Sequence, residues 1–259
     1  MLGKLFKHEL IDLFRKTILY FSIVIGLSIL VFIFGKLSEN YIFFGFVNQL
    51  FLIGYFLSIA GILIYSIFYP VTRYYKSMLK DEGYLTHTLP VTKGQLLFSK
   101  LVSAFILFFV SLIVFAVSFL ILIGTLVPID EFITLIKQLI SGISSSDFVS
   151  VILLFTYLII YYFSAIMLFI TALTLGHSRS IKKGTNSLFA GIIIYFIQQG
   201  LGTIILGVLF LSTDFQQALE TGEFNPTSII LISMITYLIL VVAEILTTHY
   251  FLKKKLNIE

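Results

Sequence analysis

Six long apolar runs constrain this sequence more than any other feature, because each of them can cross the hydrocarbon core of a bilayer. A transmembrane α-helix requires about 20 consecutive apolar residues. The chain is 59% hydrophobic and only 12% charged, whereas soluble domains average about 25% charged residues, and this difference excludes a soluble fold. The sequence therefore predicts an all-α integral membrane protein whose six transmembrane helices occupy about residues 17–35, 42–69, 101–126, 151–175, 188–211 and 228–252.

The distribution of lysine and arginine predicts how these spans are oriented. Connections on the cytoplasmic side of a membrane protein are enriched in these two residues. With both termini in the cytoplasm, only Lys36 and Lys137 of the 17 basic residues lie on the outer side, and the opposite orientation reverses that distribution. We therefore predict six spans with both ends in the cytoplasm. The chain has no Cys, which excludes disulfides and thiolate metal sites.

Residues 1–16 precede the first span and have an amphipathic pattern. Apolar residues recur there at three- and four-residue steps, and charged residues occupy the opposite face. A basic helix of this kind lies in the membrane surface, so we predict an interfacial elbow helix over residues 1–16. The alternative is a positively charged flank of the first span with no separate role.

The outer connections are too small to form an extracellular domain. Apolar residues from Phe132 to Ile143 form a stripe that predicts a helix on the outer interface after Pro128. The segment 212–227 is short and acidic. No cleavable signal or internal repeat is evident, so residues 1–259 are predicted to form a single transmembrane domain.

The longest polar interruption, residues 70–100, is predicted to be a structured cytoplasmic loop. Its charged residues, such as Arg73 and Lys80, exclude it from lipid. Residues 92–95, Thr-Lys-Gly-Gln, form a capping box at the start of the next helix. Pro90 disfavours helix at Leu89 and separates that helix from a shorter one upstream.

The shorter helix is predicted to begin at Asp81, a plausible N-cap, and to end at Leu89. Tyr84, Leu85 and Thr88 fall at helical spacing within it. A structured cytoplasmic helix with an apolar tip is typical of a docking surface.

A few polar side chains fall inside the apolar runs and are candidates for a substrate pathway. Ionisable groups within a span are costly and suggest a function, so Glu244 either ties its helix to a neighbour or takes part in substrate passage or coupling. Side-chain amides in spans commonly join helices, at about 1 kcal/mol each, and the same two interpretations hold for them. Tyr55 either packs against neighbouring helices or takes part in recognition of a substrate. These candidates are Asn48, Gln49, Tyr55, Gln198, Gln199 and Glu244.

No catalytic motif supports an enzyme. The four histidines fall in predicted cytoplasmic segments or at span ends, and no zinc-protease, nucleophile-elbow or paired-aspartate pattern is present. The chain also lacks a phosphate-binding loop of the G-x-x-x-x-G-K-[ST] type. We therefore predict that it binds no cofactor or metal and no nucleic acid. If ATP is used, another chain binds it.

Residues 80–95, Lys-Asp-Glu-Gly-Tyr-Leu-Thr-His-Thr-Leu-Pro-Val-Thr-Lys-Gly-Gln, resemble the segment between spans two and three of type-2 ATP-binding-cassette (ABC) exporter permeases. That family has an acidic residue and Gly, a short run ending in Leu, and Pro-Val or Pro-Leu before span three. The likeness extends loosely to the whole chain, through an elbow helix and six spans with both ends inside. It is strongest to small permeases of Gram-positive bacteria in peptide export or antimicrobial-peptide resistance.

The resemblance implies a division of labour between chains. A coupling helix would dock on a separate ABC ATPase subunit, which would hold the ATP and Mg²⁺. A second permease chain, identical or sibling, would complete the pathway in the bacterial plasma membrane, and an amphipathic substrate would move outward. The short connection between spans five and six departs from relatives with larger re-entrant elements. The residues that the resemblance assigns to docking are Asp81, Glu82, Gly83, Tyr84, Leu85, Thr88, Leu89 and Pro90.

A stand-alone membrane protein is the alternative interpretation. A secondary transporter is expected to show repeats and broken spans with ion ligands near mid-depth, whereas this chain has one acidic residue there and no repeat. A sensor or scaffold without an ATPase partner is the other form of this alternative.

Overall fold

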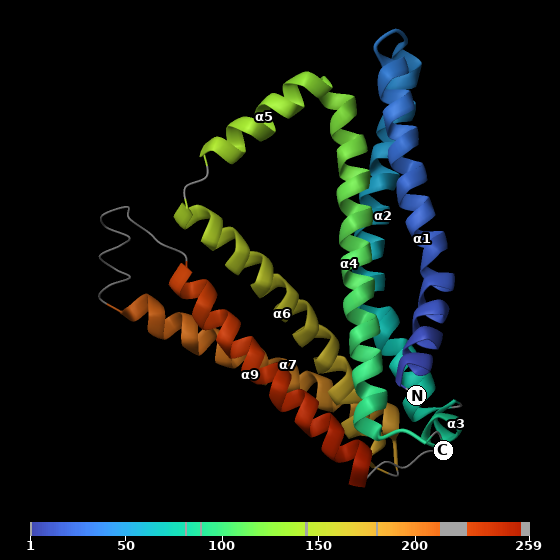
Figure 1. Ribbon diagram of the computed structural model, residues 1–259, viewed down its shortest axis with the longest axis vertical. Coiled ribbons are helices and arrows are strands. Elements are labelled where there is room, and N and C mark those ends of the chain that lie inside the picture. The colour runs from blue at the N-terminus through green and yellow to red at the C-terminus, as the bar shows by residue number, and fades with distance from the viewer. Residues whose placement is uncertain are drawn as a thin grey trace. The chain divides into compact units, whose positions relative to one another are not determined.

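The computed structural model describes residues 2–80, 82–88, 90–142, 145–179, 181–212 and 227–254. These residues are almost entirely helical (Figure 1). The helices are α1 (Leu2–Ser38), α2 (Ile42–Tyr74), the π-helix η1 (Tyr75–Leu79), α3 (Gly83–Thr88), α4 (Lys93–Leu126), α5 (Ile129–Gly142), α6 (Ser145–His177), α7 (Lys183–Leu211) and α9 (Thr227–Lys254).

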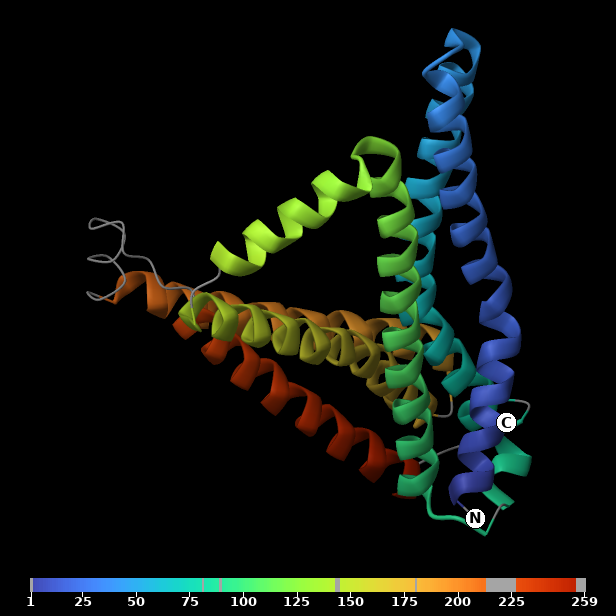
Figure 2. The same cartoon turned by 45° about the horizontal axis from the view of Figure 1, so that its top comes forward.

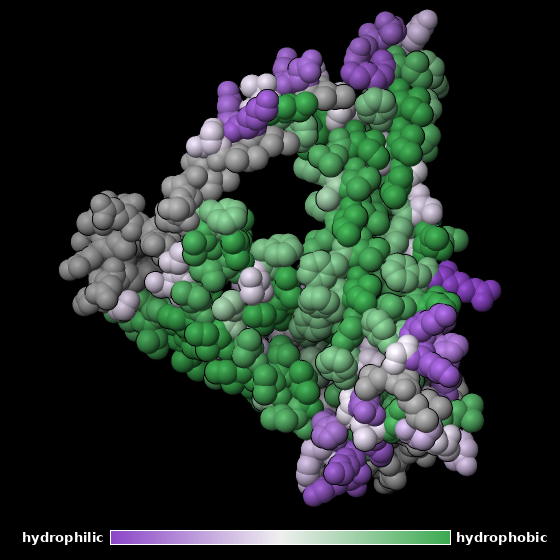
Figure 3. Space-filling model, viewed as in Figure 1, coloured by the Kyte–Doolittle hydropathy of each residue, from purple (hydrophilic) through white to green (hydrophobic). Residues whose placement is uncertain are grey.

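Within the described residues, the structure has the six long apolar helices that the sequence predicts. Six helices are long and apolar enough to cross a bilayer: α1, α2 with η1, α4, α6, α7 and α9. On the face seen in Figure 3, hydrophobic side chains cover most of the visible helix surface, and many of the hydrophilic ones lie near helix ends. Large apolar side chains such as Ile42, Phe196 and Leu246 are more than half exposed, which water does not favour and lipid does.

The helices extend beyond the apolar runs from which the spans were predicted. Of the predicted loop 70–100, residues up to Leu79 continue the second helix and residues from Lys93 begin the next. A charged residue ends an apolar run but does not end a helix, so the run underestimates helix length. Pro70 lies inside α2, and a proline within a helix removes one backbone hydrogen bond. Five residues further on, the helix changes to the wider π form.

The N-terminal residues also continue into the first span. One unbroken helix, α1, covers Leu2–Ser38, so an elbow helix separate from the span is not seen. Between Lys4 and Ile25 the sequence contains neither Gly nor Pro, the residues that most often interrupt a helix. The amphipathic pattern of the first 16 residues is therefore carried by the first turns of a long helix.

The chain divides into two compact units. The first consists of Met1–Pro70 and Gln95–Gly142, and the second of Val71–Gly94 and Ile143–Glu259. In the first, Val24, Tyr55 and Leu107 form a buried core between α1, α2 and α4. The Tyr55 hydroxyl lies 3.2 Å from Ser118 Oγ within that unit, and α5 is the helix predicted after Pro128.

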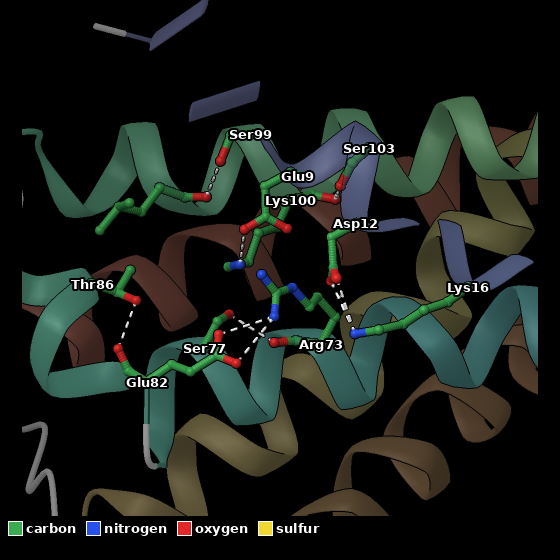
Figure 4. Close-up of polar contacts among 11 residues, drawn as sticks. Glu9, Asp12, Lys16, Arg73, Ser77, Glu82, Thr86, Ser99, Lys100 and Ser103 are labelled. Carbon is green, nitrogen blue, oxygen red and sulfur yellow. Dashed lines mark hydrogen bonds and ion pairs between the residues drawn. The ribbon is translucent and has the colours of Figure 1, made fainter. Parts of the chain in front are cut away.

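An ion pair joins two helices of the first unit. Lys100 Nζ lies 2.8 Å from Glu9 Oε1, and the two side chains are only 6% and 12% exposed (Figure 4). Lys100 was predicted to belong to the polar loop, yet it is well inside α4. Because a buried charge is costly unless paired, this contact ties the first turns of α1 to α4.

Candidate functional sites in the second unit

The helices α6, α7 and α9 form the body of the second unit and pack along one another (Figure 2). The short connection after His177 makes α6 and α7 an antiparallel hairpin. Its register is set by close approaches at Gly176 to Ser187 and at Gly191 to Ala172. Glycine is required at the first of these, since a Cβ on Gly176 would collide with the backbone of Ser187. The connection itself contains Lys182 in the left-handed conformation, with φ of 51°.

A hydrogen-bonded cluster joins the three helices near their middle. Gln198 Nε2 donates to Glu244 Oε1 at 2.7 Å and to Ser164 Oγ at 3.1 Å. All three side chains are buried. Glu244 Oε2 is also buried and has no hydrogen-bond partner among the described residues. One turn further along α9, Thr248 and Thr171 of α6 share a hydrogen bond of 3.0 Å.

A cavity of about 530 Å³ follows the α6–α7 hairpin from this cluster to the connection. Ser164, Gln198 and Gln199 line one end, and His177, Ser187 and Gly184 line the other. Between them the walls are mainly apolar, with Leu168 and Ile192 among the lining side chains. The His177 Nδ1–H donates to the Leu173 carbonyl at 2.8 Å, which fixes the ring at its end of the cavity.

The predicted docking helix is α3. The residues at its start are held by contacts with the rest of the unit, whereas Tyr84 and Leu85 are exposed. Gly83 is buried, and Tyr84 and Leu85 are 70% and 68% exposed. Arg73 Nη1 bonds both carboxylate oxygens of Glu82, at 3.0 and 3.3 Å, directly before the helix (Figure 4). Thr88 and Pro90 are exposed.

Two of the predicted docking residues, Asp81 and Leu89, lie outside the described residues. The start of the following helix at Lys93, directly after Thr92, is where the capping box predicts it. The Lys93 ammonium donates to the Leu252 carbonyl of α9 at 2.6 Å. This contact closes the far end of the segment onto the body of the second unit.

The predicted pathway residues fall into different units. Gln198 and Glu244 are in direct contact, and Gln199 is exposed and lines the cavity. Asn48, Gln49 and Tyr55 belong to the first unit. There Tyr55 is fully buried in the core, which fits the packing interpretation, Asn48 is half-buried and Gln49 is exposed.

Several polar residues of the second unit were not singled out from the sequence. Ser164, Thr171 and Thr248 are small hydroxyl residues scattered within apolar runs, and most such residues simply bond their own helix backbone. His177 and Ser187 sit at the ends of spans, where polar residues are ordinary. Their common feature is a neighbour on another helix, and one sequence alone does not reveal that neighbour.

Within the described residues, no three or more His, Asp or Glu side chains are grouped so that they could hold a metal ion. The candidate sites are therefore a polar cluster, an adjoining apolar cavity and an exposed helix tip. Comparison of the chain with family models, curated protein sequences and solved structures finds no match.

Proposed function

We propose that this chain is the membrane-spanning permease subunit of an ABC exporter in the bacterial plasma membrane. A separate ATPase subunit binds and hydrolyses ATP, and a second permease chain, identical or sibling, completes the complex. The observation that carries the proposal is helix α3, which presents Tyr84 and Leu85 to its surroundings between two long apolar helices. An aromatic and an aliphatic side chain on a firmly held helix are the anchors that protein interfaces favour.

The contacts of α3 make it suitable for transmitting a movement of the ATPase to the membrane-spanning helices. It packs against η1, whose Met78 and Leu79 are buried, and η1 in turn contacts α6. Just before η1, the Tyr74 hydroxyl and Thr174 Oγ1 of α6 are 2.6 Å apart in the buried interior. A force on α3 therefore acts on the end of the second span and on α6, not on a free loop.

The cycle follows from this connection. ATP binding draws the two partner ATPases together, each α3 moves with its ATPase, and the attached helices tilt. ATP shifts the equilibrium only by its differential affinity for the two states, so tight seating of α3 is necessary for coupling. The exported substrate is amphipathic, of the peptide, antimicrobial-peptide, lipid or drug classes, and the outward direction comes from the family resemblance.

Docking is tested by the double variant Tyr84→Arg plus Leu85→Glu, purified in detergent from cells that express it at native level. Both side chains are exposed, so the fold is expected to survive. We expect an ATPase subunit with a phosphate-binding loop to co-purify with the unmodified chain, as identified by mass spectrometry, and to be lost from the variant.

The matched control is Ile181→Glu, which charges an equally exposed apolar residue in the α6–α7 connection. It should retain the ATPase. If the double variant retains the ATPase as well, α3 is not the docking element. If no ATPase accompanies the unmodified chain, the protein acts alone as a secondary transporter, sensor or scaffold.

A further inference from the structure

We propose that the α6–α7 cavity binds one acyl chain of an anionic membrane lipid, with the lipid head group at the connection between the two helices. The site is independent of whether an ATPase docks on α3. Three properties of the cavity carry the inference: its length, the chemistry of its walls, and the charge at one end.

The cavity is long enough to hold the acyl chain of a lipid in one leaflet of a bilayer. The cavity extends along α6 from Tyr161 to His177, and 16 residues at 1.5 Å per residue make about 24 Å. The hydrocarbon core of a bilayer is about 30 Å thick, so the acyl chains of one leaflet occupy about 15 Å. A volume of about 530 Å³ is within the range of roughly 300–1,000 Å³ that is typical of ligand sites.

The walls suit a hydrocarbon chain. Leu168, Phe169 and Ile192 line the middle of the cavity, and the lining residues include no Asp, Glu, Lys or Arg. At the end of the cavity that lies away from the α6–α7 connection, the Gln198 amide already donates to Ser164 and Glu244. An acyl chain there leaves those hydrogen bonds intact. Leu188 and Tyr195 line the cavity and are exposed, so a chain can enter sideways from the bilayer.

Positively charged residues are concentrated in the α6–α7 connection, next to the other end of the cavity. His177 and Gly184 line the cavity there, and the residues between them include Arg179, Lys182 and Lys183. From Gly176 to Ser212 the sequence contains no Asp or Glu. Basic pockets between transmembrane helices bind anionic lipid head groups, and each nearby Lys or Arg contributes about 1 kcal/mol, or roughly fivefold in affinity.

The test uses the purified full chain in nanodiscs that contain a phosphatidylglycerol with a photoreactive diazirine on one acyl chain. A phosphatidylcholine with the same modified chain is the comparison lipid. After irradiation, labelled peptides are identified by mass spectrometry. We expect phosphatidylglycerol to label the cavity-lining residues of α6 and α7 at least fivefold more than phosphatidylcholine, and unlabelled phosphatidylglycerol to compete.

Two variants locate the lipid. Ala165→Phe places a ring where a small residue lines the cavity and should reduce this labelling about tenfold, whereas Ile193→Phe, on the exposed side of α7, should not. Arg179→Gln with Lys182→Asn should remove the preference for phosphatidylglycerol but leave acyl labelling, since Asn tolerates the left-handed conformation of residue 182. Lys253→Gln with Lys254→Gln removes two exposed charges elsewhere and should preserve the preference.

Three outcomes would overturn the proposal. One is equal labelling by the two lipids in the unmodified chain. Another is labelling spread evenly over all lipid-exposed helices and insensitive to Ala165→Phe. The third is labelling of the cavity only in monomers and never in dimers, which would mean that a second copy of the chain covers it.

Discussion

Two buried contacts between polar side chains bear on stability at the scale of single residues. Glu9 and Lys100 form an ion pair in the first unit, and Gln198 bonds Glu244 in the second. The energetic consequence differs, because the first contact contains two formal charges and the second a neutral donor.

Lys100→Met is predicted to destabilise the protein more than most single substitutions. It removes the Lys100 ammonium from the Glu9 carboxylate, and breaking a buried ion pair by removing one member costs about 3–5 kcal/mol. The double variant Glu9→Leu plus Lys100→Met should recover most of that loss, because it removes both charges. Thermal unfolding in detergent, followed by circular dichroism, measures the three stabilities. A double variant as unstable as Lys100→Met would contradict the paired-charge explanation.

Gln198→Leu should lower stability by about 1–2 kcal/mol, the scale of interhelical hydrogen bonds in membranes. The substitution removes the Gln198 donor from the Glu244 carboxylate, whose second oxygen already lacks a partner among the described residues. A double-mutant cycle with Glu244→Leu should give a coupling energy of about 1 kcal/mol. Gln199→Leu is the control, since that side chain is exposed, and it should change stability by less than about 0.5 kcal/mol. Equal effects at the two glutamines would argue against the cluster.

At the scale of elements, two local features shape the second unit. The backbones of α6 and α7 approach closely at glycines, and the end of α2 changes from an α-helix to a π-helix. Small residues let membrane helices approach closely where apolar burial offers little driving force, and Gly176 and Gly191 have that role here. The end of α2 contains Pro70, and η1 follows it before the turn into α3. The first feature shapes the cavity, and the second leads the chain into α3.

Gly176→Ala is predicted to open the hairpin. The added methyl group would overlap the backbone of Ser187, which cannot move aside as a side chain can. Overpacking of this kind costs about 1–3 kcal/mol, and the proposed lipid labelling of the cavity should fall with it. Gly200→Ala, in the same hairpin with open space around it, should be neutral or stabilising by up to about 1 kcal/mol. The stabilities of Gly176→Ala and Gly200→Ala are compared by unfolding in detergent. Equal stability of the two variants would show that Gly176 and Ser187 are far enough apart to accommodate a methyl group.

At the scale of the whole molecule, six apolar helices make the chain a multi-pass membrane protein. Its orientation is a prediction from the basic residues. An even number of spans returns the chain to the side on which it starts. The polar segment with α3 therefore faces the cytoplasm only if the N-terminus does, and the proposed function requires this.

The absence of Cys from the chain makes the orientation directly testable. Single cysteines at Asn40 and at Thr86 should react differently with a membrane-impermeant maleimide added to intact cells. We expect labelling of Asn40→Cys, in the turn between α1 and α2, and labelling of Thr86→Cys only after the cells are permeabilised. Labelling of Thr86→Cys in intact cells would place α3 outside and exclude docking on a cytoplasmic ATPase.

The sequence by itself determined the number and approximate position of the spans, because hydrophobicity acts locally along the chain and each span requires about 20 apolar residues. It also located α3, the start of α4 and the helix after Pro128, through caps and prolines that act on their immediate neighbours. Gln198 and Glu244 were recognised as candidates because polar groups are rare in spans.

Only the tertiary structure decided which of these residues meet. The contact of Gln198 with Ser164 and Glu244, the pairing of Lys100 with Glu9, and the cavity along α6 and α7 all join residues far apart in the sequence. The continuation of the second helix from Pro70 to Leu79 was missed, because a charged residue ends an apolar run but does not end a helix. Lys93 and Lys100 of α4 meet the Leu252 carbonyl and the Glu9 carboxylate, and such partners are a property of packing rather than of local sequence.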